Sequence, residues 1–212
     1  QQHIESVTGI YVPFWLFDSE VSANIRYKAT RVHHWSDSNY TYTRTSYYSL
    51  LRSGKIAYDN VPVDGSAKMS NELMESIEPF DLSQGVDFQT AYLAGYLADK
   101  YDVTANECKP RANDRIRTGT EQAFAATTAG YATVFAEHTN IQLQGSRIRY
   151  GLLPVWMLTT RYQEKLYTFA MNGQTGKMVG NLPIDWKLFW MYLLTIGLGS
   201  GALISAIACL VG

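Results

Sequence analysis

The chain has 212 residues, an apolar fraction of 46% and a formal net charge of −1, which argues against a disordered chain and a strongly basic nucleic-acid binder. Its 15 tyrosines favour sheet. The two cysteines, Cys108 and Cys209, are too few for a disulfide framework and form no Cys-x-x-Cys pair. We therefore expect two free thiols in a reducing compartment.

The first third of the chain predicts antiparallel sheet. After a helix end at residues 1–7, the segment IYVPFWLFDS reads as a short apolar strand. The run from Val21 to Tyr58 is rich in Tyr, Thr, Val and Arg, and residues 40–43 alternate with the period of a strand. Because Ser53-Gly54 is a turn signal, we predict a meander of three or four strands.

The middle of the chain is acidic and predicts helices. Residues 59–107 hold ten acidic and two basic residues. Apolar spacing predicts a short helix within Ser66–Glu78, and the segment TAYLAGYLADKYD favours another. Thr104-Ala-Asn-Glu107 has the form of a capping box. It opens a helix predicted to run to Thr128, bent at Pro110.

Sheet returns after residue 130, and a motif repeats there. The segments beginning GIYVPFW and YGLLPVW share an apolar lead, Pro-x-Trp and a second strand, so Pro13 matches Pro154 and Trp15 matches Trp156. Proline lacks an N–H donor, so each is expected at a strand start, edge or bulge. The order predicts an α+β fold: two related hairpin modules, 9–58 and 131–180, flank a helical insert at 66–128 within a domain of residues 1–184.

The second module contains the densest motif. Residues 152–162 and 166–171 are expected to pair across a turn at Glu164-Lys165. Two further turns follow, at Asn172-Gly173, where a positive φ is expected, and at Gly176. A phosphate-binding loop would need a helix directly after it, but the strand-like residues 178–180 follow instead. We therefore interpret the motif as packing.

The C-terminal residues predict a membrane span over 185–212. Residues 188–211 carry no charge, and a helix of that length crosses a hydrocarbon core of about 30 Å. Gly197 and Gly201 have GxxxG spacing, which would allow a homodimer through this helix; the alternative is that glycine is simply common in membrane helices. Lys187 favours a cytoplasmic position for residues 1–184 in a single-pass protein of the cell membrane. The alternative is a buried helix.

No catalytic, cofactor-binding or metal-ligating residue is assigned. His33 and His34 are adjacent on a strand and face opposite sides, so they cannot share a metal without a bulge. Asp18 with Glu20, and Glu75 with Glu78, are carboxylate pairs that general acid–base chemistry would need in a cleft. Two cationic clusters suggest nucleic acid or anionic lipid, but pairing with the acidic middle segment is favoured. The first is Lys109, Arg111, Arg115 and Arg117; the second is Arg26, Lys28, Arg31, Arg44, Arg52 and Lys55.

The chain resembles a family of bacterial membrane proteins, mainly from Firmicutes, that contain a zinc ribbon of the TFIIB type. The resemblance covers nearly the whole chain, and its most specific parts are Pro154–Trp156 and Asn172–Gly180. The resemblance implies one or two cysteine ribbons, then this α+β region, then a membrane segment. The ribbons are absent from this chain, so any zinc cofactor would belong to an upstream ribbon.

These observations lead to three expected functions. The first is a membrane-anchored, non-catalytic adaptor with protein partners in a bacterial membrane-stress module. The second is a membrane-tethered nucleic-acid binder that acts through a missing upstream ribbon, since nucleic acid is not expected on this region itself. The third is an unrecognised hydrolase.

Overall fold

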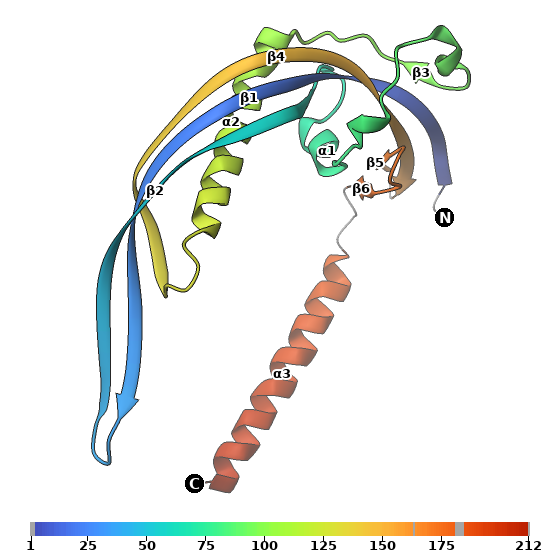
Figure 1. Cartoon of the computed structure of the whole chain (residues 1–212). Helices are drawn as coiled ribbons and strands as arrows, with labels where there is room; N and C mark the ends of the chain where they lie inside the picture. The colour runs from blue at the N-terminus through green and yellow to red at the C-terminus, as the bar shows by residue number, and fades with distance from the viewer. Residues whose placement is uncertain (1–2, 163, 181–184, 212) are drawn as a thin grey trace.

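A computed structural model describes residues 3–162, 164–180 and 185–211, with side chains for residues 6–145, 147–161, 164–180 and 185–201. Most of these residues form one largely antiparallel sheet that curls into a half-barrel (Figure 1). In chain order the elements are β1 (His3–Ser36), β2 (Thr41–Asp64), α1 (Asn71–Ser76), the 3-10 turns η1 (Leu82–Gln84) and η2 (Thr90–Leu93), β3 (Leu97–Ala98), α2 (Ala105–Ala126), β4 (Thr133–Tyr162), β5 (Lys165–Asn172), β6 (Met178–Gly180) and α3 (Trp186–Val211).

The long strand β1 runs through the centre of the sheet. The strand order is β2-β1-β4-β5-β6, and β3 pairs with β1 in parallel. The predicted meander is wrong, because β1 and β2 are two long continuous strands, and β1 begins at His3 where a helix end was expected. Ser53 and Gly54 lie inside β2, paired with Asn24 and Ala23. Pairing with β1 therefore overrides the local turn preference.

The two Pro-x-Trp segments lie side by side in the sheet, one on β1 and one on β4. Pro13 pairs with Leu152, and Pro154 pairs with Tyr11. Both strands are central, so a position at a strand start, edge or bulge was the wrong expectation. The sheet tolerates each proline because, on one side of its strand, the hydrogen-bonded pairing with the neighbouring strand ends just before the proline. The β1–β2 pairs stop at Phe14, and the β4–β5 pairs stop at Val155.

Each proline accepts an equivalent backbone hydrogen bond from a glycine. Pro13 accepts at its carbonyl from the Gly65 N–H, and Pro154 accepts from the Gly173 N–H, each at 2.8 Å. In a strand, the N–H and C=O of one residue point to the same neighbour. The missing N–H of each proline therefore faces the side where the ladder ends, so no ladder bond is lost.

The sequence signals for α2 and α1 hold in the structure. Thr104 and Glu107 form the predicted capping box, with Glu107 accepting from the Thr104 N–H at 2.7 Å, and α2 continues through Pro110. Ser70 caps the short helix α1. The segment at 90–102 forms the turn η2 and the strand β3 rather than the helix that was favoured.

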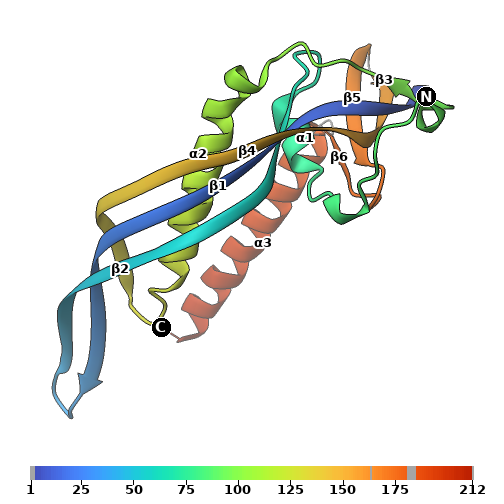
Figure 2. The same ribbon diagram turned by 45° about the horizontal axis from the view of Figure 1, so that its top comes forward.

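The helices cover the concave face of the sheet in two places (Figure 2). Ile116 and Phe124 of α2 pack against the buried residues Val21–Ala29 on the inward face of β1. Met74 and Ile77, in and just after α1, pack against Val12 and Phe14. Because both clusters include β1, this strand joins the core from one end of the body to the other.

The predicted α+β class, with two separate hairpin modules and a transmembrane helix, is therefore wrong. The hairpins do form, since β1 pairs with β2 and β4 pairs with β5. However, β1 also pairs with β4 from His3 to Thr30, which merges them into one sheet. The described part of the chain is mostly antiparallel sheet with three α-helices, and the insert supplies α1 and α2.

The structure also corrects the predicted membrane span. Residues 186–211 form α3, but its side chains are described only from Trp186 to Gly201. Among the residues that the structure describes, no helix has the length and apolar character needed to cross a membrane. The expected single-pass membrane location is therefore not supported.

Candidate functional site

A two-stranded arm extends from the body of the sheet and is the most distinctive exposed feature of the molecule (Figures 1 and 2). We define the arm as residues 31–46. β4 begins at Thr133, opposite Thr30, so beyond that point β1 and β2 pair only with each other. Residues 31–45 are all exposed. The arm therefore presents two faces and two strand edges to the surroundings.

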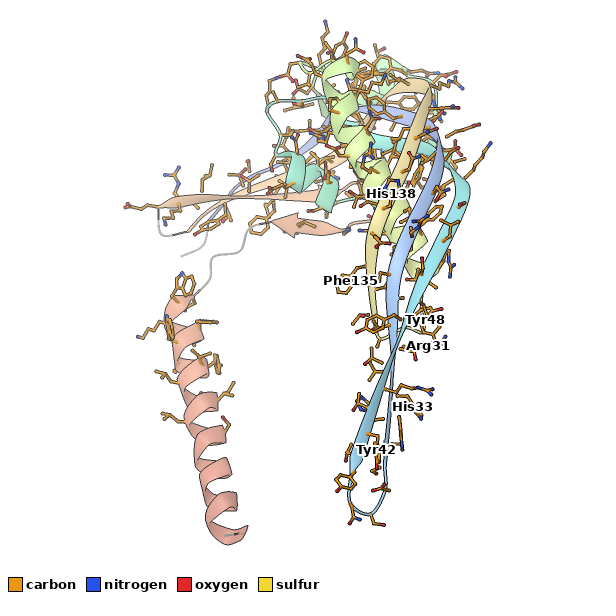
Figure 3. All side chains as sticks on the ribbon, turned by 90° about the vertical axis from the view of Figure 1, so that its left-hand side faces the viewer. Arg31, His33, Tyr42, Tyr48, Phe135 and His138 are labelled. Atoms are coloured by element: carbon orange, nitrogen blue, oxygen red, sulfur yellow. The ribbon has the colours of Figure 1, made fainter. Side chains whose placement is uncertain are left out.

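One face of the arm is aromatic and basic. Residues paired directly across an antiparallel ladder share a face, and Trp35 pairs with Tyr42, His33 with Arg44 and Arg31 with Ser46. Trp35 stacks on Tyr42 with ring centroids 5.4 Å apart and planes 13° apart, and His33 stacks on Trp35 at 5.6 Å. Figure 3 shows His33 and Tyr42 on the arm, beyond Arg31.

This face continues the inward face of β1 past the end of the core. Ala29 is the last fully buried residue in the alternating series on β1, and Arg31 is the next residue on the same side. Its guanidinium lies 4.8 Å from the ring centroid of Tyr131 and 5.7 Å from that of Tyr48. Stacking of Arg31 on these two rings therefore ties the base of the arm to the body.

Local contacts hold the tip of the arm in shape. Asp37 accepts hydrogen bonds from the N–H groups of Asn39 and Tyr40, each at 2.9 Å, and from the Tyr42 hydroxyl at 3.0 Å. The bond from Asn39, followed by those from Tyr40 and Tyr42, holds the pKa of Asp37 below its usual value. An isolated two-stranded hairpin is only marginally stable in water. These contacts provide the extra restraint.

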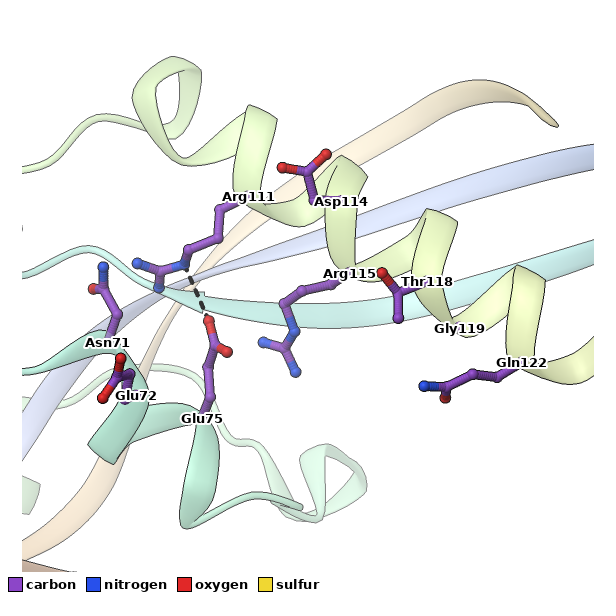
Figure 4. Close-up of a pocket in the computed structure, with 9 residues that line it drawn as sticks. All are labelled: Asn71, Glu72, Glu75, Arg111, Asp114, Arg115, Thr118, Gly119 and Gln122. Carbon is purple, nitrogen blue, oxygen red and sulfur yellow. Dashed lines mark ion pairs between the residues drawn. The ribbon is translucent and has the colours of Figure 1, made fainter. Parts of the chain in front are cut away.

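A second polar feature is a hollow of about 530 Å³ between α1 and α2 (Figure 4). Arg111 makes ion pairs with the buried Asp64 and, at 3.3 Å, with Glu75. Arg115 binds both carboxylate oxygens of Glu78, at 3.0 and 2.6 Å. Burial raises the pKa of Asp64 and of Glu78, against the opposing effect of the arginines. These pairs join α2 to β2 and to the end of α1.

The side chains considered for catalysis or metal binding either lie apart from one another or take part in packing. Cys108 is buried, with its thiol 3.5 Å from the Asp64 carbonyl oxygen, and burial raises its pKa, which disfavours the thiolate. Asp18 pairs with Arg149, and the neighbouring Glu20 is exposed. His34 bonds Thr43 on the arm face opposite to His33. No three His, Cys, Asp or Glu residues in the described part of the chain gather to hold a metal ion.

The predicted basic cluster near the start of α2 divides into two pairs. Arg111 and Arg115 bind carboxylates of the acidic segment, as favoured from the sequence, whereas Lys109 and Arg117 are exposed.

The structure places the Pro-x-Trp tryptophans in packing contacts. Trp15 donates its indole N–H to the Val103 carbonyl at 3.0 Å and contacts Tyr101 and Tyr150 edge-on. Trp156 packs on Tyr96. The two tryptophans therefore fasten the segment before α2 to β1 and β4.

Asn172 is the centre of the glycine-rich turn and is fully buried. Its side-chain amide donates to the carbonyls of Ile77 and Pro79, at 3.0 and 2.9 Å, and its oxygen accepts from the N–H groups of Gln174 and Thr175. Asn172 therefore fixes the β5–β6 turn onto the loop after α1.

Different physical reasons explain why glycine occupies positions 173 and 176 of this turn. Gly176 has a positive φ, 73°, whereas Asn172 and Gly173, where a positive φ was expected, do not. A Cβ on Gly173 would lie 2.8 Å from the Pro154 carbonyl oxygen, so close approach explains this glycine. On α3, nothing in the described part of the chain lies within 4 Å of the Cβ positions of Gly197 and Gly201.

The sequence contains a partial signal for the arm. In the run RVHHWSDSNYTYTR, aromatic residues stand on both sides of an Asp-Ser-Asn turn, and residues 40–43 after it alternate with the period of a strand. This pattern predicts a hairpin, but it does not show that the hairpin would extend past the neighbouring strand.

Comparison with known proteins gives one informative relative. Over 182 residues, 86% of the chain, the sequence is 42% identical to a protein of Bacillus subtilis (strain 168) described as "uncharacterized protein YdjG". The matched region makes up 53% of that protein, so the chain spans about half the length of the relative. No solved structure matches the chain.

No protein-family model matches the chain either. The zinc-ribbon description expected from the resemblance therefore has no support, and the described helices do not support the membrane description.

Proposed function

We propose that the protein is a non-catalytic adaptor that binds a protein partner through the arm. The observation that supports the proposal is the arm itself, which exposes Trp35, Tyr42 and Arg44 on one face beyond the end of the core. Tryptophan, tyrosine and arginine are the residues that contribute most often to binding energy in protein interfaces. Stacking already orders these rings, which reduces the entropy lost on binding.

The polar hollow between α1 and α2 supports the non-catalytic part of the proposal. Its arginines are engaged by Asp64, Glu75 and Glu78. General acid–base catalysis needs a carboxyl that can exchange a proton with a substrate. In the described residues these carboxyls instead link α1, α2 and β2, which is a structural role.

The test compares capture of partners by two matched double variants. The full chain carries a photo-crosslinking residue at Tyr40, which is 67% exposed at the tip of the arm. We expect Trp35→Ala/Tyr42→Ala to reduce crosslinked partner by about tenfold or more, as loss of a central aromatic anchor does. The control, Trp186→Ala/Tyr192→Ala, removes the same residue types from exposed positions on α3 and should leave the yield unchanged.

Equal yields from both double variants would contradict the proposal. Circular dichroism and urea unfolding of each variant, measured beside the capture, show whether the fold is retained. Arm residues add nothing to the buried clusters of the body, so the fold should be retained.

A further inference from the structure

The surface charge of the chain is strongly asymmetric along its length. Residues 21–58, which include the arm, hold six basic residues and only one acidic residue, Asp37. We define the acidic loop as residues 81–102. It holds four acidic residues and one basic residue, Lys100. The two regions therefore carry opposite net charge, at two separate places in the fold.

The acidic loop also exposes apolar side chains. Val86 is 70% exposed, Phe88 is 61% exposed, and Tyr92 and Leu97 are 46% and 61% exposed. Asp87 lies between Val86 and Phe88 and makes no ion pair among the described residues. Exposed apolar side chains in one loop, together with an unpaired carboxylate, suit a basic, aromatic partner.

The arm has the complementary character. Arg44 is exposed and makes no ion pair within the described part of the chain, and it shares a face with Trp35 and Tyr42. Rings on the arm match apolar side chains on the acidic loop, and Arg44 matches Asp87. The two surfaces are therefore complementary in both charge and apolar character.

One copy of the chain cannot bring these two surfaces together. The acidic loop leads into β3, which pairs with β1 at Ile10, and Trp35 lies near the far end of the same strand. At about 3.3 Å per residue, roughly 80 Å of strand separates Ile10 from Trp35. Figure 1 shows the arm and β3 at opposite ends of the curved sheet.

We propose that the arm of one copy docks on the acidic loop of a second copy. Different surfaces meet in this contact, so each docked pair retains one unused arm and one unused loop. Such a head-to-tail contact repeats and builds open chains unless its rotation closes a ring. This inference rests on the proposed adaptor function and names a second copy as the arm's partner.

The experiment is sedimentation velocity of the purified full chain over a range of concentration and salt. We expect a series of oligomers at low salt. The dissociation constant should rise about tenfold or more between about 0.05 M and 0.5 M salt, because exposed charge pairs are screened. The arm variant is Trp35→Ala/Arg44→Glu, and the loop variant is Asp87→Arg/Phe88→Ala. Each retains one competent surface, so each alone should remain monomeric.

Mixing the two variants provides the decisive measurement. The loop variant keeps its arm and the arm variant keeps its loop, so the mixture should form dimers and no larger species. A monomeric wild-type chain at low salt would overturn the inference. It would also be overturned by association that ignores salt and both variants, as contact through α3 would, or by loss in the arm variant only, which indicates arm–arm contact.

The outcome is separable from that of the adaptor test. If Tyr40 crosslinking still depends on Trp35 and Tyr42 while the pure chain stays monomeric, the second copy is the wrong partner and the adaptor function stands. Binding of a single-stranded oligonucleotide by the arm, with no self-association, would overturn both proposals.

Discussion

At the scale of single residues, buried polar groups fix the ends of the sheet. Asn172 and Asp64 occupy matching positions, since each is the last residue of a strand that pairs beside a proline. Asn172 satisfies both ends of its amide with four hydrogen bonds, whereas Asp64 needs the arginine from α2. The same place in two related hairpins is therefore stabilised by neutral hydrogen bonds in one and by an ion pair in the other.

Asn172→Ala should lower the free energy of unfolding by about 3 kcal/mol. The substitution leaves the buried carbonyls of Ile77 and Pro79 without their donor and removes the acceptor of two turn N–H groups. Urea unfolding provides the measurement. Asn24→Ala, on the exposed side of β1, is the matched control and should change the value by less than about 0.5 kcal/mol. Equal losses would show that the hydrogen bonds of Asn172 are not specific.

Asp18 predicts a pH dependence on the acid side. Burial raises the pKa of its carboxyl, but hydrogen bonds from the Asn60 N–H and from Arg149 outweigh burial and hold the pKa below 3.8. The unfolded chain therefore takes up this proton at a higher pH than the folded chain. The stability that Asp18 contributes is present above pH 3.8 and is lost as the pH falls through its folded pKa.

We therefore expect Asp18→Asn to be less stable than the wild type at about pH 6, with a difference that shrinks below about pH 4. Urea midpoints measured across this range give the comparison. Glu20→Gln, on the neighbouring exposed carboxylate, should show no such convergence. A gap for Asp18→Asn that is the same at both ends of the range would contradict the assignment.

At the scale of elements, the arm is separable from the body. It continues β1 and β2 past Thr30, but the buried clusters draw on no residue between 31 and 46. Its own stacking and its Asp37 turn are local. Removing the arm should therefore leave the sheet intact.

The element-scale prediction is that residues 32–45 can be replaced by Asn-Gly, which joins the paired residues Arg31 and Ser46 through a two-residue turn. The free energy of unfolding should change by less than about 1 kcal/mol, because an isolated hairpin contributes little. Urea unfolding checks this. A large loss would mean that the arm supports the body, and the arm variants used for binding would then need reinterpretation.

The sequence predicts the elements in this chain that depend on local signals. The capping box at Thr104 gives the start of α2, and the turn near Glu164 gives the β4–β5 hairpin. It fails for β1 and β2, because Pro13 in β1 and the Ser53-Gly54 pair in β2 are strand breakers when only the local sequence is considered. Their effects disappear where a ladder ends beside a proline or where a partner strand continues the pairing.

At the scale of the whole molecule, one strand links every part of the core. Val12 and Phe14 belong to one buried cluster, Phe17 to a second, and Val21–Ala29 to a third. This arrangement could not be predicted from the sequence, because it depends on pairing between residues more than 100 positions apart. The arm was missed for the same reason, since its exposure is decided by where β4 begins.

Because β1 is shared, we expect the sheet to unfold in a single transition. Phe14→Ala and Phe124→Ala lie in different clusters, and each should lower the free energy of unfolding by about 3–5 kcal/mol. In each variant, tryptophan fluorescence and circular dichroism of the sheet should give coincident curves. Separate transitions, each shifted by only one variant, would show two independent units.

The central position of β1 also has a consequence for the order in which the chain can assemble during synthesis. The β1–β2 hairpin can pair as soon as residue 64 is made. The other edge of β1 must wait for β4, since Thr30 pairs with Thr133, 103 residues later. Until then the long inner edge of β1 has no strand beside it and can pair with another nascent chain. The acidic insert, with the helix α2 that covers β1, is made within this interval and precedes the partner strand.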